Sequence, residues 1–343
     1  MSKLVKSKKF QTFLLLALTI LVLFFLLKDN FVPVVTQIFK MDLFWIVVTM
    51  LLIFGFWLFK AFGINIITNQ MYPEFKVRDS IKINLTAQFF NSITPWAVGG
   101  HPVQLYLLKQ KNISLSDGTN IIIQNFIVYQ IAISVIQMFA VAFIFTANLF
   151  TDNYLFKTLI LIGFILDFVI ILLLFVLAFA KKLKVFFIKI GIYFLEKFKF
   201  VKNKEKTLAE WDEKLDNFHK GAYQLMKNKK DFIKAIACNL IGLIAFYLTP
   251  LTLLYATGNY DSINAFQSIY LISCANMVGD LIPTPGKIGG FEFAFTTLFL
   301  KYIEPTVLSA ILIAWRFFSY YLTLIIGGIM MNLKKQESKQ IVS

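Results

Sequence analysis

Four charged side chains stand in stretches of the sequence that are otherwise apolar. Asp280, Lys287 and Glu292 lie within the segment DLIPTPGKIGGFE. Arg316 follows in AWRFFSYY. Ionisable groups in such surroundings are costly, so they pair with one another or serve a function. An arginine there requires a carboxylate or a phosphate. These residue types predict either a structural ion pair between Glu292 and Arg316, or a site in which Arg316 or Lys287 also receives a phosphate.

Two acids in apolar surroundings have no single interpretation. Asp280 directly precedes LIPTPG, where it either caps the turn by accepting hydrogen bonds from loop amides or takes part in the site. Asp167, in GFILDFVI, lies in the middle of an apolar run and has no evident partner. The sequence predicts an acid within the membrane at this position and leaves its role open.

A second unusual stretch, ITPWAVGGHPVQ, is polar but holds no acid, lysine or arginine. Its glycines leave backbone N–H groups exposed, and such amides at the start of a helix can hold an anion. His101 is either a hydrogen-bonded turn residue or a proton carrier, and Gln104 follows one turn later. The candidate substrate-binding residues are therefore Asp280, Lys287, Glu292, Arg316, His101 and Gln104. The prolines and glycines of the two interrupted stretches are Pro95, Gly99, Gly100, Pro283, Pro285, Gly286, Gly289 and Gly290.

The cysteines and histidines give no support for a metal or redox site. Cys238 and Cys274 both lie in apolar stretches, and their spacing matches neither a disulfide framework nor a metal motif. The two histidines, His101 and His219, are far apart and have no companion ligands. The sequence contains no GxxxxGK[ST] phosphate loop, so we expect no intrinsic ATPase. We expect no cofactor and no metal.

The composition indicates an integral membrane protein. Hydrophobic residues make up 58% of the 343 residues and charged residues only 15%, compared with about 25% in an average soluble domain. A helix needs about 20 apolar residues to cross a bilayer. Such runs occupy residues 11–27, 43–66, 119–147, 155–180, 232–256 and 306–331. We expect the first to be an uncleaved span rather than a signal peptide, because no small-residue cleavage site follows it.

The basic residues are clustered in a way that orients the chain. The net charge is +15, from 34 basic and 19 acidic residues. Lysines precede the first apolar run, follow the last one, and number 14 against six acids in the loop 181–230. Residues 183–200 of this loop are typical of an amphipathic interfacial helix. The positive-inside rule places both termini and this loop in the cytoplasm. Orientation and attraction to anionic lipids account for the charge, so we expect no nucleic-acid partner.

This orientation leaves two interrupted segments, about 80–112 and 263–303, that are not full crossings. If 80–112 crossed the membrane, the lysine-rich loop would lie outside. Each segment therefore dips into the membrane and returns, the first from the cytoplasm and the second from outside. The predicted fold is all-α: one domain over 1–343 with six full spans and two oppositely oriented re-entrant helix pairs, as in inverted repeats. Such segments indicate a substrate site near the midplane.

Three stretches carry a resemblance to a known family: FFNSITPWAVGGHPVQLYLLKQKNIS (89–114), LIPTPGKIGGFEFAF (281–295) and AWRFFSYYLTLIIGG (314–328). They resemble the transmembrane region of lysylphosphatidylglycerol synthases, the flippase-like membrane domain of the multiple peptide resistance factor family. The likeness extends over about 10–332. The matching positions are Pro95, Gly99, Gly100, Pro285, Gly286, Gly289, Glu292 and Arg316. Lys287 departs from the family, which often has glycine there, and this added charge leaves the substrate preference open.

The resemblance implies a bacterial plasma-membrane domain that moves a charged phospholipid between leaflets, as in antimicrobial peptide resistance. In full-length members a soluble aminoacyl-transferase domain follows, whereas only LKKQESKQIVS follows Asn332 here. We therefore expect a flippase for a polar or aminoacylated phospholipid. Two alternatives stay open: phosphatidylglycerol lysyltransferase activity with a partner catalytic domain, and a non-transporting accessory protein. The candidate partners are an anionic or aminoacylated phospholipid, a separate transferase and a second copy of the chain.

Overall fold

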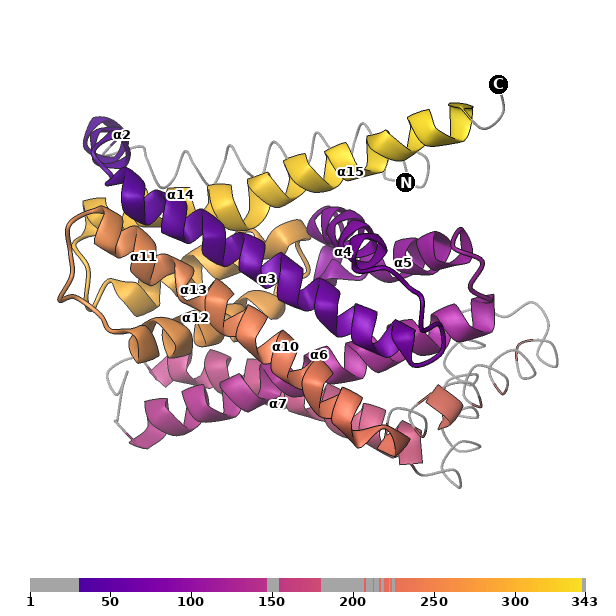
Figure 1. The fold of residues 1–343 in the computed structure, drawn as a ribbon. Helices are drawn as coiled ribbons and strands as arrows, with labels where there is room; N and C mark the ends of the chain where they lie inside the picture. The colour runs from indigo at the N-terminus through magenta and orange to yellow at the C-terminus, as the bar shows by residue number, and fades with distance from the viewer. Residues whose placement is uncertain are drawn as a thin grey trace, which may run out of the picture.

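The computed structural model describes residues 31–146, 154–179 and 226–340, with a few positions between 207 and 223. All regular elements among these residues are helices (Figure 1), so the all-α expectation is confirmed there. The expected first span, 11–27, and the expected amphipathic segment, 183–200, lie outside the described residues.

Five of the described helical segments are long and apolar enough to cross a membrane. They are Leu43–Asn69 (α3), Leu115–Thr146 (α6), Tyr154–Val176 within α7 (Tyr154–Phe179), Lys229–Ala256 (α10, Lys229–Tyr247, with α11, Thr249–Ala256) and Pro305–Met331. The last contains α14 (Pro305–Arg316), the π-helical turn η4 (Phe317–Tyr321) and the first part of α15 (Leu322–Gln340). A short helix, α2 (Phe31–Phe39), precedes α3. Each crossing segment matches an apolar run of the sequence within a few residues, so this is a multi-pass membrane protein.

The two interrupted segments each consist of a helix, a break and a second helix. The first contains α4 (Val77–Ser92), η1 (Pro95–Ala97) and α5 (Gly100–Lys109), and we call it the first hairpin. The second hairpin contains α12 (Ala265–Asp280), η3 (Pro285–Lys287) and α13 (Gly290–Phe299). Helices of 16 and 10 residues are about 24 and 15 Å long, too short to cross a core of about 30 Å. Both helix pairs predicted from the sequence are present.

The first hairpin begins and ends beside the C-terminal end of α3. Asn65, near that end, donates from Nδ2 to the carbonyl oxygen of Phe75 at 3.0 Å and to Ser80 Oγ at 3.1 Å. Lys111 follows α5 and its Nζ lies 2.6 Å from Oδ1 of Asp79, in the first turn of α4. The open end of this hairpin is therefore tied to one end of the molecule.

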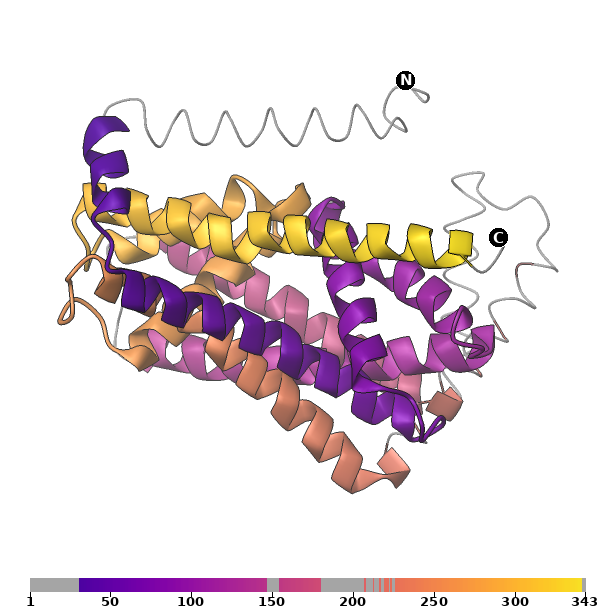
Figure 2. The same ribbon diagram turned by 45° about the horizontal axis from the view of Figure 1, so that its top comes forward.

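The second hairpin begins beside the opposite end of α3. Asp42, the N-cap of α3, donates its N–H to the carbonyl oxygen of Ala256 at 2.8 Å. Trp45 packs against Tyr255 and Tyr260, with ring centroids 4.9 and 6.4 Å apart, in the segment that leads into α12. Because α3 has 27 residues, or about 40 Å, the two hairpins enter from opposite ends (Figure 1 and Figure 2). Their breaks, η1 and η3, contact each other.

The last span contacts both hairpins, one with each half. On α14, Trp315 stacks on Phe291 of α13 with ring centroids 4.4 Å apart, and its Nε1 donates to Thr249 Oγ1 at 2.9 Å. On α15, Gly327 permits a close approach to α4, since a Cβ there would lie 2.8 Å from the carbonyl oxygen of Leu85. Figure 2 shows α15 running over α4. In lipid, such tight packing and buried hydrogen bonds stabilise helix contacts more than hydrophobic transfer does.

Candidate functional site

Glu292 and Arg316, the ion pair expected from the residue types, meet between the second hairpin and the last span. Arg316 Nε lies 2.6 Å from Glu292 Oε1, and the two side chains are 12% and 9% exposed. The N–H of Nε does not point along this line, so the contact is a charge pair rather than an aligned hydrogen bond. Glu292 lies in the first turn of α13, where the helix dipole favours a carboxylate.

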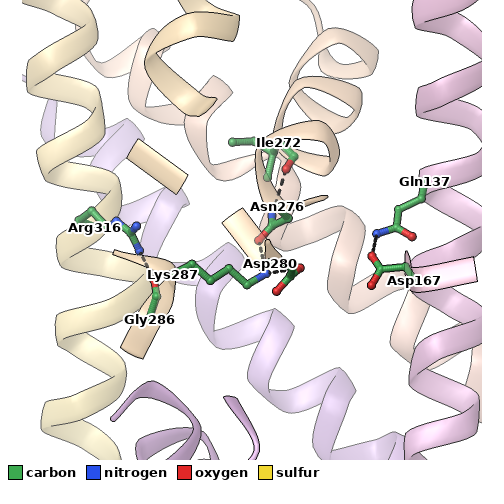
Figure 3. Close-up of polar contacts among 8 residues, drawn as sticks. All are labelled: Gln137, Asp167, Ile272, Asn276, Asp280, Gly286, Lys287 and Arg316. Carbon is green, nitrogen blue, oxygen red and sulfur yellow. Dashed lines mark hydrogen bonds and ion pairs between the residues drawn. The ribbon is translucent and has the colours of Figure 1, made fainter. Parts of the chain in front are cut away.

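Both partners of this pair also hold the second break. Glu292 Oε2 accepts a hydrogen bond from the N–H of Gly289 at 2.7 Å. Arg316 Nη1 donates to the carbonyl oxygen of Gly286 at 3.0 Å (Figure 3), and its guanidinium carbon lies 4.8 Å from the ring centroid of Phe291. Within the described part of the chain, Nη2 of Arg316 is buried and has no hydrogen-bond partner. The guanidinium is therefore fixed in place, while the two N–H groups of Nη2 lack an acceptor inside the protein.

Lys287 forms a second polar cluster with the end of α12. Its Nζ donates to Asp280 Oδ2 at 2.8 Å and to Asn276 Oδ1 at 3.0 Å (Figure 3). Asn276 and Asp280 are one helical turn apart, so they share a face of α12. Lys287 has a left-handed backbone, with φ of 59°. Asp280 therefore pairs with Lys287 of the break. Because no described loop amide donates a hydrogen bond to Asp280, the contacts do not fit a capping role.

Tyr320 connects the two hairpins, although the sequence did not single it out. Its ring lies against Gly286, where an added Cβ would be 2.2 Å from Cε2 of the ring. Its hydroxyl donates to the carbonyl oxygen of Ser92, at the end of α4, at 3.1 Å. The spacing of four residues from Arg316 is the one sequence signal that could have placed Tyr320 on the same helical face.

The glycine amides of the first break are occupied, which corrects the expectation that they are free to hold an anion. The N–H of Gly99 donates to Thr94 Oγ1 at 2.9 Å, and the N–H of Gly100 donates to Asn91 Oδ1 at 2.7 Å. Both acceptors lie at the C-terminal end of α4 or just after it. The chain turns back tightly there, so polar side chains that precede the break reach the amides that follow it. No ligand is needed to satisfy these donors.

His101 and Gln104 lie on α5, apart from the charged cluster. His101 packs edge-on against Phe126 of α6, with ring centroids 5.5 Å apart. Its Nδ1 and the Oε1 of Gln104 are buried and lack a hydrogen-bond partner among the described residues. Neither residue lines the cavity that contains Lys287 and Arg316. Their assignment to the substrate site stays a prediction.

A cavity of about 160 Å³ lies where the two breaks meet. It is lined by residues of both hairpins and of the last span, among them Asn91, Trp96, Asp280, Lys287, Arg316 and Tyr320. One water molecule takes about 30 Å³ of liquid volume, so the cavity has room for a phosphate-sized group and its water but for no acyl chain. Glu292 is not part of the lining and acts on the cavity through Arg316.

Asp167 has a partner that the sequence did not reveal. Gln137 of α6 donates from Nε2 to Asp167 Oδ2 at 2.6 Å (Figure 3). No spacing rule links residues on two different helices, so the sequence could not predict this pair and only the folded structure shows it. No basic side chain in the described ranges forms an ion pair with Asp167.

Comparison with known sequences adds a family to this geometry. Residues 12–327 match the protein family described as lysylphosphatidylglycerol synthase TM region. The chain is also similar to the UPF0104 membrane protein of Archaeoglobus fulgidus, with 23% identity over 319 residues, which cover 86% of this chain and 88% of that protein. The family match includes both hairpins and Arg316.

Proposed function

Because the chain belongs to the lysylphosphatidylglycerol synthase transmembrane region family, we propose that it translocates a phospholipid with a polar or aminoacylated head group across the bacterial plasma membrane. The observation that carries this proposal is the charged cavity between two hairpins that enter from opposite ends. Interrupted segments of opposite orientation are typical of transporters that bind their substrate near the midplane.

The phosphate of the head group would bind between the cations of the cavity. Arg316 offers its unpartnered Nη2, and Lys287 offers an ammonium that Asp280 and Asn276 already orient. Charge-assisted hydrogen bonds of this kind are about twice as strong as neutral ones. The volume of about 160 Å³ leaves the acyl chains outside, in the lipid.

Alternating access would come from rocking of the hairpins about their shared contact. The breaks η1 and η3 touch, and Tyr320 contacts both Gly286 and Ser92. In this proposal these contacts close the path between the two sides. Separating the breaks on one side would open the cavity to that leaflet.

The charge distribution supports a cytoplasmic position for the open end of the first hairpin. Lys76, Arg78, Lys109 and Lys111 outnumber Glu74 and Asp79 there, whereas beside the second hairpin Asp261 and Glu304 outnumber Lys301. The positive-inside rule favours the basic end in the cytoplasm, with both termini on that side.

A leaflet-resolved lipid assay tests the proposal. The purified full chain is placed in vesicles that contain fluorescent phosphatidylglycerol or lysyl-phosphatidylglycerol, and a membrane-impermeant quencher reports the outer-leaflet fraction. We expect the protein to accelerate exchange of probe, and Arg316→Ala to abolish that acceleration. Lys234→Ala, at a side chain 67% exposed, is the matched loss of a cation and leaves transport unchanged. Equal rates with and without protein would refute translocation.

Lys287→Gly tests the head-group assignment in a variant that is expected to fold. Glycine accepts the φ of 59° at this position more easily than lysine does, and it is the residue often found in the family. The change removes a cation and frees the Asp280 carboxylate. We expect slower exchange of phosphatidylglycerol and faster exchange of lysyl-phosphatidylglycerol, whose ammonium groups can replace Lys287. An unchanged ratio of the two rates would contradict this role of Lys287.

The enzyme alternative predicts a different result in the same vesicles. If the chain acts as a phosphatidylglycerol lysyltransferase with a partner domain, lysyl-tRNA and phosphatidylglycerol would yield lysyl-phosphatidylglycerol only when both proteins are present. Product formation that requires this chain, without any probe exchange, would replace the translocase proposal.

A further inference from the structure

Asp167 is the one mid-depth carboxylate among the described residues that no basic side chain neutralises. Glu292 pairs with Arg316, and Asp280 pairs with Lys287. Asp167 comes 13 residues after the start of α7 (154 to 167), which corresponds to about 20 Å along the helix. A charged carboxylate that is neither paired nor well hydrated at this depth is costly, and a proton removes that cost.

The packing of α7 on α12 brings a second carboxylate to the same region. A Cβ at Gly163 would lie 2.5 Å from the carbonyl oxygen of Met277, so the two helices are in close contact there. Asp167 follows Gly163 by one turn, and Asp280 follows Met277 by about one turn. Figure 3 shows the two carboxyl groups on facing sides, with Lys287 bonded to Asp280. The ammonium of Lys287 therefore lies near two carboxyl groups, those of Asp280 and Asp167.

The other groups near Asp167 do not neutralise it. From α6, Gln137 contributes a neutral amide and Tyr129 a phenol. Lys60 of α3 places its Nζ 4.0 Å from the ring centroid of Tyr129, as a cation–π contact, and forms no ion pair among the described residues. The charged and titratable groups around Asp167 are thus Asp280, Lys287, Lys60 and two phenols, those of Tyr129 and of Tyr247 on α10.

α6 carries a row of polar side chains that leads from the basic end of the molecule to Asp167. The row consists of Asn120 and Gln124, then a step of six residues, about 9 Å along the helix and about 120° around it, and then Gln130, Ser134 and Gln137. Asn120, Gln124 and Gln137 are 5%, 1% and 2% exposed, and the side-chain oxygens of these three and of Ser134 have no hydrogen-bond partner within the described ranges. Buried polar atoms without protein partners are usually satisfied by ordered water. From 120 to 137 the row covers about 26 Å of helix.

We propose that Asp167 is a proton-binding site, reached from the basic end of the molecule through water held along α6, and that its protonation is coupled to lipid translocation. When Asp167 loses its proton, the new carboxylate attracts the Lys287 ammonium and weakens its contact with Asp280. The contact between Lys287 and Asp280 holds the second break, so the shape of the cavity depends on whether Asp167 is protonated. The coupling rests on the proposed function, whereas the proton site and the water row do not.

Infrared difference spectroscopy of the purified full chain tests the site without any transport. We expect a protonated-carboxyl band that titrates with pH, is missing in Asp167→Asn, and persists in Asp231→Asn, which removes an acid in the first turn of α10 that pairs with Lys234. Gln137→Leu should shift the band rather than remove it, because it deletes a hydrogen bond to the same group. Gln124→Leu should slow its hydrogen–deuterium exchange. A spectrum in which Asp167→Asn matches the unmodified chain overturns the proton site.

Vesicles with an imposed pH gradient test the coupling. The unmodified chain should exchange labelled lipid at a rate that depends on the gradient, and Asp167→Asn should exchange it at a rate that does not. If the titrating band is present but no lipid moves in any variant, the proton site stands and the proposed function fails. If lipid moves at the same rate with and without the gradient, the coupling is refuted and the proposed function stands.

Discussion

Arg316 is stabilised by three neighbours of different kinds: the Glu292 carboxylate, the Gly286 carbonyl and the Phe291 ring. Removing one member of a buried ion pair leaves the other charge uncompensated, whereas removing both charges is often nearly neutral. The pair therefore contributes more to the cost of a single substitution than to net stability.

A double-mutant cycle checks this account of the pair. Glu292→Gln should lower the free energy of unfolding by about 3 kcal/mol, and adding Arg316→Met should restore most of that loss. The exposed pair Asp231–Lys234, with Nζ and Oδ1 3.6 Å apart, is the control, and Asp231→Asn should cost less than about 1 kcal/mol. Denaturation in detergent measures the unmodified chain, Glu292→Gln, Arg316→Met, the double variant and the control Asp231→Asn. Additive losses in the cycle would show that Glu292 does not compensate Arg316.

Gly286 is required by two separate constraints, and they can be measured apart. Its φ is 63°, and a Cβ would lie 2.2 Å from the Tyr320 ring, so Gly286→Ala should cost about 2 kcal/mol or more. Gly289 has φ of 92° and ψ of −55°, outside the left-handed helical region, but no atom lies within 4 Å of its Cβ position, so Gly289→Ala reports backbone strain alone and should cost about 2 kcal/mol. Gly55→Ala, in helix α3 with open space, should be neutral or slightly stabilising. Lower melting temperatures for Gly286→Ala and Gly289→Ala than for Gly55→Ala support the account, and equal values for all three contradict it.

At the scale of elements, helix ends decide where the half-helices begin. Glu292 closes the start of α13 by accepting from Gly289, and Asn91 and Thr94 do the same for α5 with neutral groups. The two breaks are thus capped by different chemistry. The second carries the charge of Glu292 and Arg316, and the first carries none.

Glu304 caps α14 and makes the stability of this element depend on pH. Hydrogen bonds from the amides of Thr306 and Val307, at 3.0 and 3.1 Å, lower the pKa of the Glu304 carboxyl. A lowered pKa in the folded state adds stability above the ordinary pKa of glutamate, and this is lost as the pH falls through the lowered value. The unmodified chain should have a free energy of unfolding about 0.5 kcal/mol higher than the Glu304→Gln variant at neutral pH. In strong acid the two chains should be equally stable. A pH-independent difference in melting temperature would contradict this role.

At the scale of the molecule, the two hairpins enter from opposite ends and meet at their breaks.

Ser116 lies beside the base of the first hairpin and Ala265 beside that of the second, and both are exposed. In a chain with Cys238→Ala and Cys274→Ala, single cysteines at these positions should react with a membrane-impermeant maleimide from opposite sides of the membrane. Labelling of Ala265→Cys in intact cells and of Ser116→Cys only after lysis would support the cytoplasmic assignment of the first hairpin. Labelling of both from one side would refute the opposed arrangement.

Much of the architecture could be predicted because it depends on local composition. Apolar runs must form helices in a membrane, since lipid offers no partners for free backbone groups. Proline and glycine at 95–100 and 283–290 interrupt helices by their own geometry, and both hairpins were predicted from these residues. The pairing of Glu292 with Arg316 followed from the need of each buried charge for an opposite one.

Sequence alone determined the membrane class, the two broken helix pairs, the ion pair and the family resemblance. Tertiary structure decided which groups meet: Lys287 with Asp280, Tyr320 with Ser92, and Gln137 with Asp167. It also showed that the amides of the first break are already satisfied. The reason is physical. A helix start, a break or a buried charge follows from a few neighbouring residues, whereas a contact between residues up to 228 positions apart exists only once whole helices have packed.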